Sequence, residues 1–135
     1  MFFKPKAPKQ RKLMILEFQK NNKLFEHVPR SIWEVSKKPE QEADFIIEDS
    51  PYSFIFLSLK YHTNNNSKYI TNKLTAFAAK DEYKIYKKRI LLLLCDVEDD
   101  KDEIHHLHKL CEEFNLIFLC GFTFQEISSY LSTFV

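Results

Sequence analysis

The chain has 135 residues, 44% of them hydrophobic and 13 of them phenylalanine, which excludes a disordered chain and predicts one packed domain. The net charge of +1 hides an uneven distribution: residues 1–40 hold ten Lys/Arg against four Asp/Glu, and residues 96–113 hold eight acids against two lysines. This distribution fits a basic face that contacts phosphates, and it equally fits an ordinary solvated surface.

The odd cysteine count predicts a reduced, intracellular protein. Cys95, Cys111 and Cys120 cannot all pair within the chain, and two of them lie in apolar or helical segments. The longest apolar runs, such as Ile90–Cys95, are much shorter than a bilayer requires. We therefore expect neither a signal peptide nor a membrane span.

The first half of the chain predicts a tail followed by strands. Residues 1–12 are rich in Lys and Pro and are predicted to form a flexible basic tail. Apolar and β-branched runs then predict five strands, at residues 13–18, 23–28, 32–35, 44–47 and 52–61. The polar stretch 36–42 contains Pro39 and predicts a loop, and residues 63–67 (TNNNS) predict a turn.

The second half predicts alternating helices and strands. Helices are expected at residues 68–79, 99–114 and 123–134, and buried strands at 89–95 and 116–120. Thr123 and Glu126 have the spacing of a capping box at the start of the last helix. The predicted fold class is α/β, with a mixed, mostly parallel sheet and flanking helices, because helical crossovers join parallel strands.

Acidic residues leave a metal-dependent nuclease open as one function. Asp44 begins a predicted strand, and Asp96 and Glu98 follow another, whereas a two-metal site needs acids that converge on one point. Their spacing lacks the acid–x–Lys pattern of such a site and also fits a solvated loop. His105, His106, His108 and Cys111 could form a metal cluster, but a helix surface with a half-buried Cys111 fits better. With Gly121 as the single glycine, no glycine-rich phosphate loop is possible.

Aromatic, basic and hydroxyl side chains interleave near residue 60. If the strand continued to residue 61, alternation would place Phe56, Ser58 and Lys60 on one face and Leu57, Leu59 and Tyr61 on the other. A groove with tyrosine walls and lysine would suit stacking on single-stranded bases or holding a peptide. The alternative is that the aromatic side chains fill the core.

The run Phe56–His62 (FLSLKYH), together with Trp33-Glu34, Tyr69-Ile70, Arg89–Val97 and Tyr130-Leu131, resembles a known family. It is similar to the central domain of the excision-repair protein that is the non-catalytic partner of the XPF endonuclease, the Rad10/Swi10-like family. The resemblance covers residues 13–134. It implies a restriction-endonuclease-like (XPF nuclease-like) fold without an active site, and therefore no catalytic residue, metal or cofactor.

The same resemblance implies partners and binding residues. The partners would be an XPF-type catalytic subunit, a glycine-rich XPA-type peptide and single-stranded or junction DNA, in the nucleus. The peptide groove would contain Gln19, Asn22, Asp44, Phe56, Ser58, Lys60, Tyr61 and Tyr69. DNA contacts would come from Lys20, Lys23, Lys60, Lys68 and Lys73.

Departures from the family pattern are also visible. Lys60 stands where the family usually has Arg, and Phe18 stands near a usually basic position. The family's C-terminal helix–hairpin–helix pair is expected to be absent, so residues 13–135 would be the central domain alone, and monomeric. Three functions remain: a repair adaptor that binds DNA, a divergent nuclease using Asp44, Asp96 and Glu98, and a module that binds only protein.

Overall fold

The computed structural model describes residues 11–64, 67–98 and 101–135. Their strands form a six-stranded sheet in the order β2-β1-β3-β4-β5-β6. The strands are β1 (Leu13–Ile15), β2 (Trp33–Val35), β3 (Phe45–Ile47), β4 (Tyr52–Ser58), β5 (Lys88–Leu94) and β6 (Ile117–Gly121). β1 and β2 are parallel, as are β4, β5 and β6, while β3 runs antiparallel to β1 and β4. The predicted α/β class with a mixed, mostly parallel sheet is confirmed.

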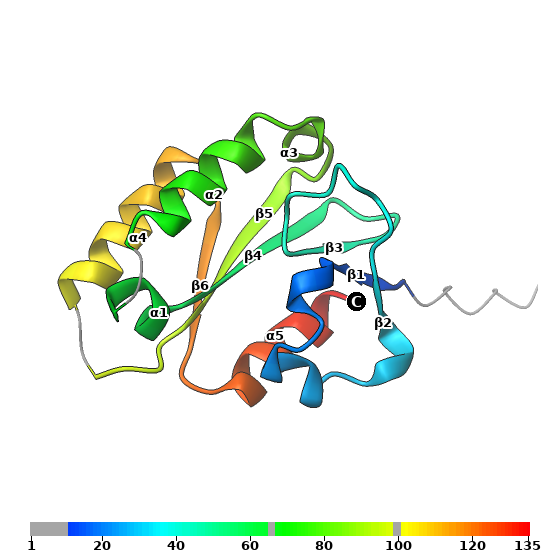
Figure 1. Ribbon diagram of the computed structural model, residues 1–135, viewed down its shortest axis with the longest axis horizontal. Coiled ribbons are helices and arrows are strands. Elements are labelled where there is room, and N and C mark those ends of the chain that lie inside the picture. Colours follow the sequence, from blue (N-terminus) through cyan, green and yellow to red (C-terminus); the bar gives the residue numbers. More distant parts are fainter. Residues whose placement is uncertain (1–10, 65–66, 99–100) are drawn as a thin grey trace, which may run out of the picture.

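Helices cover both faces of the sheet (Figure 1). One face is packed by α1 (Leu59–Asn64), α2 (Tyr69–Ala78), α3 (Asp81–Ile85) and α4 (Lys101–Glu113). The other face is packed by α5 (Phe124–Phe134) and by two short 3-10 helices, η2 (Lys23–Glu26) and η3 (Arg30–Ile32). A further 3-10 helix, η1 (Glu17–Gln19), follows β1. The molecule is therefore a three-layer sandwich around a central sheet.

β5 shows why the sheet has two separate cores. Its consecutive leucines are all buried, and successive side chains of a strand point to opposite faces. Ile90, Leu92 and Leu94 enter the core under α5. Leu91 and Leu93 enter the core under α2 and α4. A continuous apolar run is thus the expected signature of this strand, because helices cover it on both sides.

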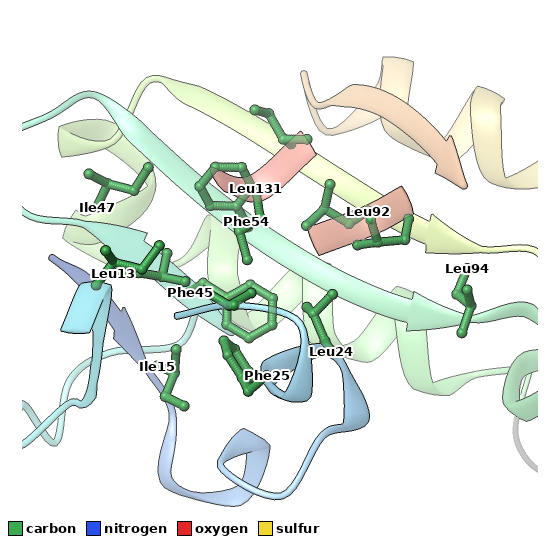
Figure 2. Close-up of a cluster of buried hydrophobic side chains, with 14 residues drawn as sticks. Leu13, Ile15, Leu24, Phe25, Phe45, Ile47, Phe54, Leu92, Leu94 and Leu131 are labelled. Carbon is green, nitrogen blue, oxygen red and sulfur yellow. The ribbon is translucent and has the colours of Figure 1, made fainter. Parts of the chain in front are cut away.

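The core on the α5 side holds the N-terminal segment against the sheet (Figure 2). The ring of Phe25 in η2 meets the ring of Phe45 in β3 edge-on, with 5.3 Å between centroids. Leu131 of α5 and Leu24 of η2 belong to the same buried cluster. η2 and α5 are far apart in sequence, so this packing fixes the position of the loop that leads from β1 to β2.

The strand predicted at residues 23–28 is wrong. Lys23–Glu26 is a 3-10 helix whose first turn is capped by the Asn22 carboxamide, which accepts a hydrogen bond from the Leu24 N–H at 2.9 Å. Leu24 and Phe25 are adjacent and enter the same core. A strand would send them to opposite faces, whereas a helical turn lets both be buried on one side.

Two other predicted strands are shorter than expected. β1 ends at Ile15, and the chain turns into η1 at Glu17. β4 ends at Ser58, and residues 59–64 form α1 instead of continuing the strand. The face assignment based on a strand reaching residue 61 is therefore also wrong. The bounds predicted for the loop, the later strands and the long helices agree with the described structure to within two residues. The short helix α3 was not predicted from the sequence.

The predicted capping box is present at the start of α5. The Thr123 hydroxyl accepts from the Glu126 N–H at 3.0 Å. The Glu126 carboxylate reaches back to the Phe122 N–H at 3.2 Å, one residue before the cap. Two otherwise unpaired N–H groups are thereby satisfied at this helix end. Residues 1–10 of the tail predicted at 1–12, and residues 65–66 of the turn predicted at 63–67, lie outside the described residues.

Candidate functional site

A groove of about 380 Å³ opens where β4 passes into α1. Its walls are mostly aromatic. It is lined by Phe18, Gln19, Phe56, Leu57, Ser58, Tyr61 and Tyr69. These residues come from η1, β4, α1 and α2, so four elements that are distant in sequence build one site. We name it the aromatic groove.

The turn from β4 into α1 places Tyr61 in the aromatic groove. The Ser58 hydroxyl accepts from the Tyr61 N–H at 3.2 Å and donates to the Asp96 carboxylate at 2.6 Å. The second oxygen of Asp96 accepts from the Lys60 N–H at 2.8 Å. Ser58 and Asp96 therefore cap the first turn of α1, because they satisfy N–H groups that the helix leaves unpaired.

Tyr61 and Tyr69 form a corner of the aromatic groove. Their rings meet edge-on, with centroids 5.5 Å apart and an interplanar angle of 88°. Tyr61 is 39% exposed. Burial raises the pKa of the Tyr69 hydroxyl well above its usual range, and the negative charges of Asp44 and Glu42 act in the same direction. The Tyr69 phenol thus stays neutral at physiological pH. Both rings present flat faces with a polar tip.

A buried ion pair lies beneath the aromatic groove. Asp44 is fully buried, and its carboxylate accepts from the Phe56 N–H at 2.7 Å. The Lys73 ammonium lies 3.5 Å from the other carboxylate oxygen. Burial raises the pKa of Asp44, while Lys73, the Phe56 N–H and Gln19 lower it in turn. The Asp44 side chain thus joins β4, through the Phe56 N–H, to α2, through Lys73.

Asn22 and Gln19 link the floor of the aromatic groove to η2. The Asn22 amide donates to the Gln19 side-chain oxygen at 3.0 Å, while its own oxygen caps η2. Asn22 lines a separate hollow of about 260 Å³ that is also bounded by Phe25 and Trp33. One N–H and one oxygen lone pair of Asn22 are thus used within the protein, which leaves its second N–H and second lone pair for a ligand.

The structure brings together five of the eight residues predicted for the peptide groove. Gln19, Phe56, Ser58, Tyr61 and Tyr69 line the aromatic groove. Asn22, Asp44 and Lys60 do not line it. Asn22 lies in the neighbouring hollow, Asp44 lies beneath, and Lys60 is exposed on α1.

Phe18 lines the aromatic groove and was missed from the sequence. It is 64% exposed, since η1 turns the chain outward just after β1. The strand predicted to continue to residue 18 made Phe18 look like a core residue at the end of an apolar run. The exposure of Phe18 becomes evident only because β1 ends at Ile15.

The lysines predicted to contact DNA fall into two groups. Lys20, Lys23, Lys60 and Lys68 are exposed, and Lys20 also pairs with Glu17 at 2.7 Å. Lys73 is only 8% exposed, and its ammonium is directed to Asp44 and Glu42. The phosphate contact predicted for Lys73 is therefore not compatible with its position.

The acids of the nuclease hypothesis are not gathered at one point. Asp44 is buried with Lys73, Asp96 caps α1, and Glu98 is exposed on the loop after β5. Within residues 11–64, 67–98 and 101–135, no three His, Cys, Asp or Glu side chains are placed to share a metal ion. Two of the three carboxylates stabilise the chain around the aromatic groove.

The histidine-rich stretch on α4 is a helix surface. His105 and His106 are exposed, and the His108 ring lies beside the Phe118 ring at 5.3 Å. Cys111 is 1% exposed, which is more buried than the half-buried position predicted. Burial raises the pKa of its thiol to about 12, so it is a poor nucleophile and metal ligand.

Comparison with known proteins identifies the family. Residues 10–135 match the family model described as the binding domain of DNA repair protein Ercc1 (rad10/Swi10). The chain belongs to this family. The Rad10/Swi10 membership confirms the resemblance carried by Phe56–His62, and the mixed sheet with helices on both faces is consistent with the nuclease-like fold of that family.

A curated relative in the Rad10/Swi10 family is the mating-type switching protein swi10 of Schizosaccharomyces pombe. It is 32% identical over 116 residues, which cover 86% of this chain and 42% of swi10. The chain therefore spans less than half the length of that relative. No helix in the described part of the chain is long and apolar enough to cross a bilayer.

Proposed function

We propose that this domain is part of a DNA-repair subunit that helps to position an XPF-type structure-specific endonuclease on DNA. It would do so by binding partners and not by cutting DNA. Membership of the Rad10/Swi10 family supports the repair role. The aromatic groove supports the binding role, because it is concave and largely apolar and its walls include Phe18, Tyr61 and Tyr69. Asp44 and Asp96, which a nuclease would use, stabilise its floor and rim.

The proposed ligand of the aromatic groove is a glycine-rich peptide of an XPA-type damage-verification protein. Glycine has no side chain, so its backbone can approach the faces of Tyr61 and Tyr69 closely. The phenol hydroxyls at the rim can bond to peptide carbonyl and N–H groups. Because Ser58 and Asn22 are already bonded within the protein, we expect the tyrosines and Phe56 to provide most of the affinity.

The proposed DNA contacts come from the exposed lysines around η1, η2 and α1. Lys20, Lys23, Lys60 and Lys68 supply positive charge without a means to read base sequence. The nucleus is the compartment that fits this role. In the relatives, segments beyond the matched region would also contribute to association with the XPF-type subunit.

Peptide binding is tested by titrating the domain with a short glycine-rich XPA-type peptide and following backbone NMR shifts. We expect the shifts to centre on Phe56, Tyr61 and Tyr69. Tyr61→Ala should weaken binding by about tenfold or more, since central aromatic residues dominate such interfaces. Phe122→Ala is the matched control, because Phe122 is 72% exposed and does not line the aromatic groove. Equal affinity of the two variants would refute the groove assignment.

DNA binding is tested by measuring affinity for an oligothymidylate at several salt concentrations. Lys60→Ala and Lys23→Ala should each reduce the slope of log affinity against log salt, by about 0.7 for each phosphate of a single strand that is no longer neutralised. Lys84→Ala on α3 serves as the control. β4 and β5 are parallel, and α3 precedes β5 whereas Lys60 follows β4, so the two lysines lie at opposite ends of these strands. Cleavage of branched DNA with Mg²⁺ or Mn²⁺ that disappears in Asp96→Asn would overturn the non-catalytic proposal.

A further inference from the structure

A second hollow adjoins the aromatic groove. It has a volume of about 340 Å³ and is lined by Phe18, Glu42, Tyr69, Asn72 and Lys73. Phe18 and Tyr69 line both hollows, so the two meet at these rings. An extended peptide in the aromatic groove would therefore place a neighbouring side chain in the second hollow.

Lys73 presents little positive charge to this hollow. Its side chain is 7% exposed, and its ammonium lies 3.5 Å from Asp44 Oδ1 and 3.7 Å from Glu42 Oε1. The ammonium also donates to the Glu42 carbonyl oxygen. A lysine has three donors, and three acceptors surround this one. The ammonium is thus a neutralised part of the wall and is poorly placed to attract an anion.

Carboxylates outnumber cations around Lys73. The Glu42 side chain remains 28% exposed at the hollow. Glu82 approaches the same segment from α3, where its carboxylate accepts from the N–H groups of Glu42 and Ala43 at 3.2 and 2.8 Å. The charges of Asp44 and Glu42 contribute to the raised pKa of Tyr69, after the larger effect of burial. The exposed Glu42 carboxylate is therefore the acidic group that an occupant of the hollow would meet.

We infer that the hollow bounded by Phe18, Glu42 and Tyr69 is a subsite for a cationic side chain, Lys or Arg, of the peptide held in the aromatic groove. The aliphatic stem would lie against the two rings, and the charged head would pair with the Glu42 carboxylate. This inference rests on the proposed function, because it assigns chemistry to one end of the same ligand.

An anionic occupant fits the hollow less well. A phosphate or an acidic side chain would meet the Glu42 carboxylate, and the Lys73 ammonium already lies over the Phe18 ring, 5.6 Å from its centroid. Among the described residues that line the hollow, Lys73 supplies the cation, and its ammonium already donates to the Glu42 carbonyl oxygen and lies within 3.7 Å of two carboxylates. The hollow should therefore discriminate between peptides by charge.

The test uses glycine-rich peptides that are identical except for one residue beside the glycines, which is Lys, Gln or Glu. In one series of peptides this residue precedes the glycines, and in the other it follows them; affinity is measured by fluorescence anisotropy. In the series whose variable residue reaches the hollow, the wild-type domain should bind the Lys peptide about tenfold more tightly than the Gln peptide. It should bind the Glu peptide of that series most weakly. Glu42→Gln should remove this order, whereas Glu40→Gln, two residues away on the exposed loop, should keep it.

Phe18→Ala provides a second variant in case Glu42→Gln disturbs folding. Phe18 is 64% exposed, so its removal should leave the thermal midpoint almost unchanged while reducing the preference for Lys. If all peptides bind in a Tyr61-dependent way but with equal affinity, or if the Glu peptide binds most tightly, the cationic subsite is wrong and the peptide groove stands. If no peptide binds, or if Tyr61→Ala has no effect, both proposals fail.

Discussion

The Ser58 hydroxyl at the end of β4 lies 2.6 Å from a carboxylate oxygen of Asp96, which follows the neighbouring strand β5. The same carboxylate accepts from the Lys60 N–H. This contact ends β4, begins α1 and turns Tyr61 toward the aromatic groove. An acid at the end of a buried strand, which resembles a nuclease ligand in the sequence, here supports a binding surface.

Replacing Asp96 with Ala should destabilise the start of α1. Ser58 loses its acceptor and the Lys60 N–H loses its cap, so we expect a loss of about 0.5–2 kcal/mol in the free energy of unfolding. Urea unfolding followed by circular dichroism measures it. Glu98→Ala is the control, because Glu98 is exposed on the same loop. An equal effect of the two substitutions would show that Asp96 does not act as a cap.

Removing either partner of the Asp44–Lys73 pair should be costly. Asp44→Asn keeps an acceptor for the Phe56 N–H but leaves Lys73 short of a counter-charge, and Lys73→Met leaves Asp44 unpaired. We expect each to lower the free energy of unfolding by about 3–5 kcal/mol. The double variant should lose clearly less than the sum. Additive losses in a urea-unfolding cycle would show that the two charges are not coupled.

Glu82 should make stability depend on pH in a direction opposite to that of a salt-bridged acid. Burial raises the pKa of its carboxyl above 4.5, although the Ala43 and Glu42 N–H groups and Lys73 oppose this. The folded protein thus keeps the proton to a higher pH than the unfolded chain does. Stability from this group is greatest below about pH 4.5 and is lost as the pH rises through the folded pKa.

Glu82→Gln removes this titration while keeping an acceptor for the two N–H groups. The free energy of unfolding of the wild type, minus that of the variant, should therefore fall as the pH rises from about 4 toward 8. Urea unfolding at several pH values gives both quantities, and the contribution of Asp44 cancels in the difference. A difference that rises with pH would mean that the folded pKa of Glu82 is lowered and not raised.

Gly121 should tolerate no side chain without repacking. A Cβ atom built on it would lie 2.6 Å from Ile127 Cδ1, and Ile127 is fully buried in α5. We expect Gly121→Ala to cost about 1–3 kcal/mol of stability. Because the clash involves the far end of one side chain, adding Ile127→Val should recover part of the loss. If Ile127→Val is as destabilising in the Gly121→Ala background as alone, the clash is not the cause.

Local pattern determined the regular part of the fold. The apolar run of β5, the helical spacing of α2, α4 and α5, and the Thr123–Glu126 cap are short-range features, so the sequence predicts these elements with little error. The mostly parallel sheet followed from the alternation of helices and strands. The family motif at Phe56–His62 pointed to most of the residues that line the aromatic groove.

Only the tertiary structure decided where strands end and which polar groups remain available. β4 stops at Ser58 because Asp96, 38 residues later, caps the helix that follows. Lys73 is withdrawn from solvent because Asp44 and Glu42 reach it from the segment that enters β3. Phe18 is exposed because η1 turns the chain away from the sheet. At Ser58 and Lys73, a long-range hydrogen bond and ion pairs override local preference, and no window of neighbouring residues contains them.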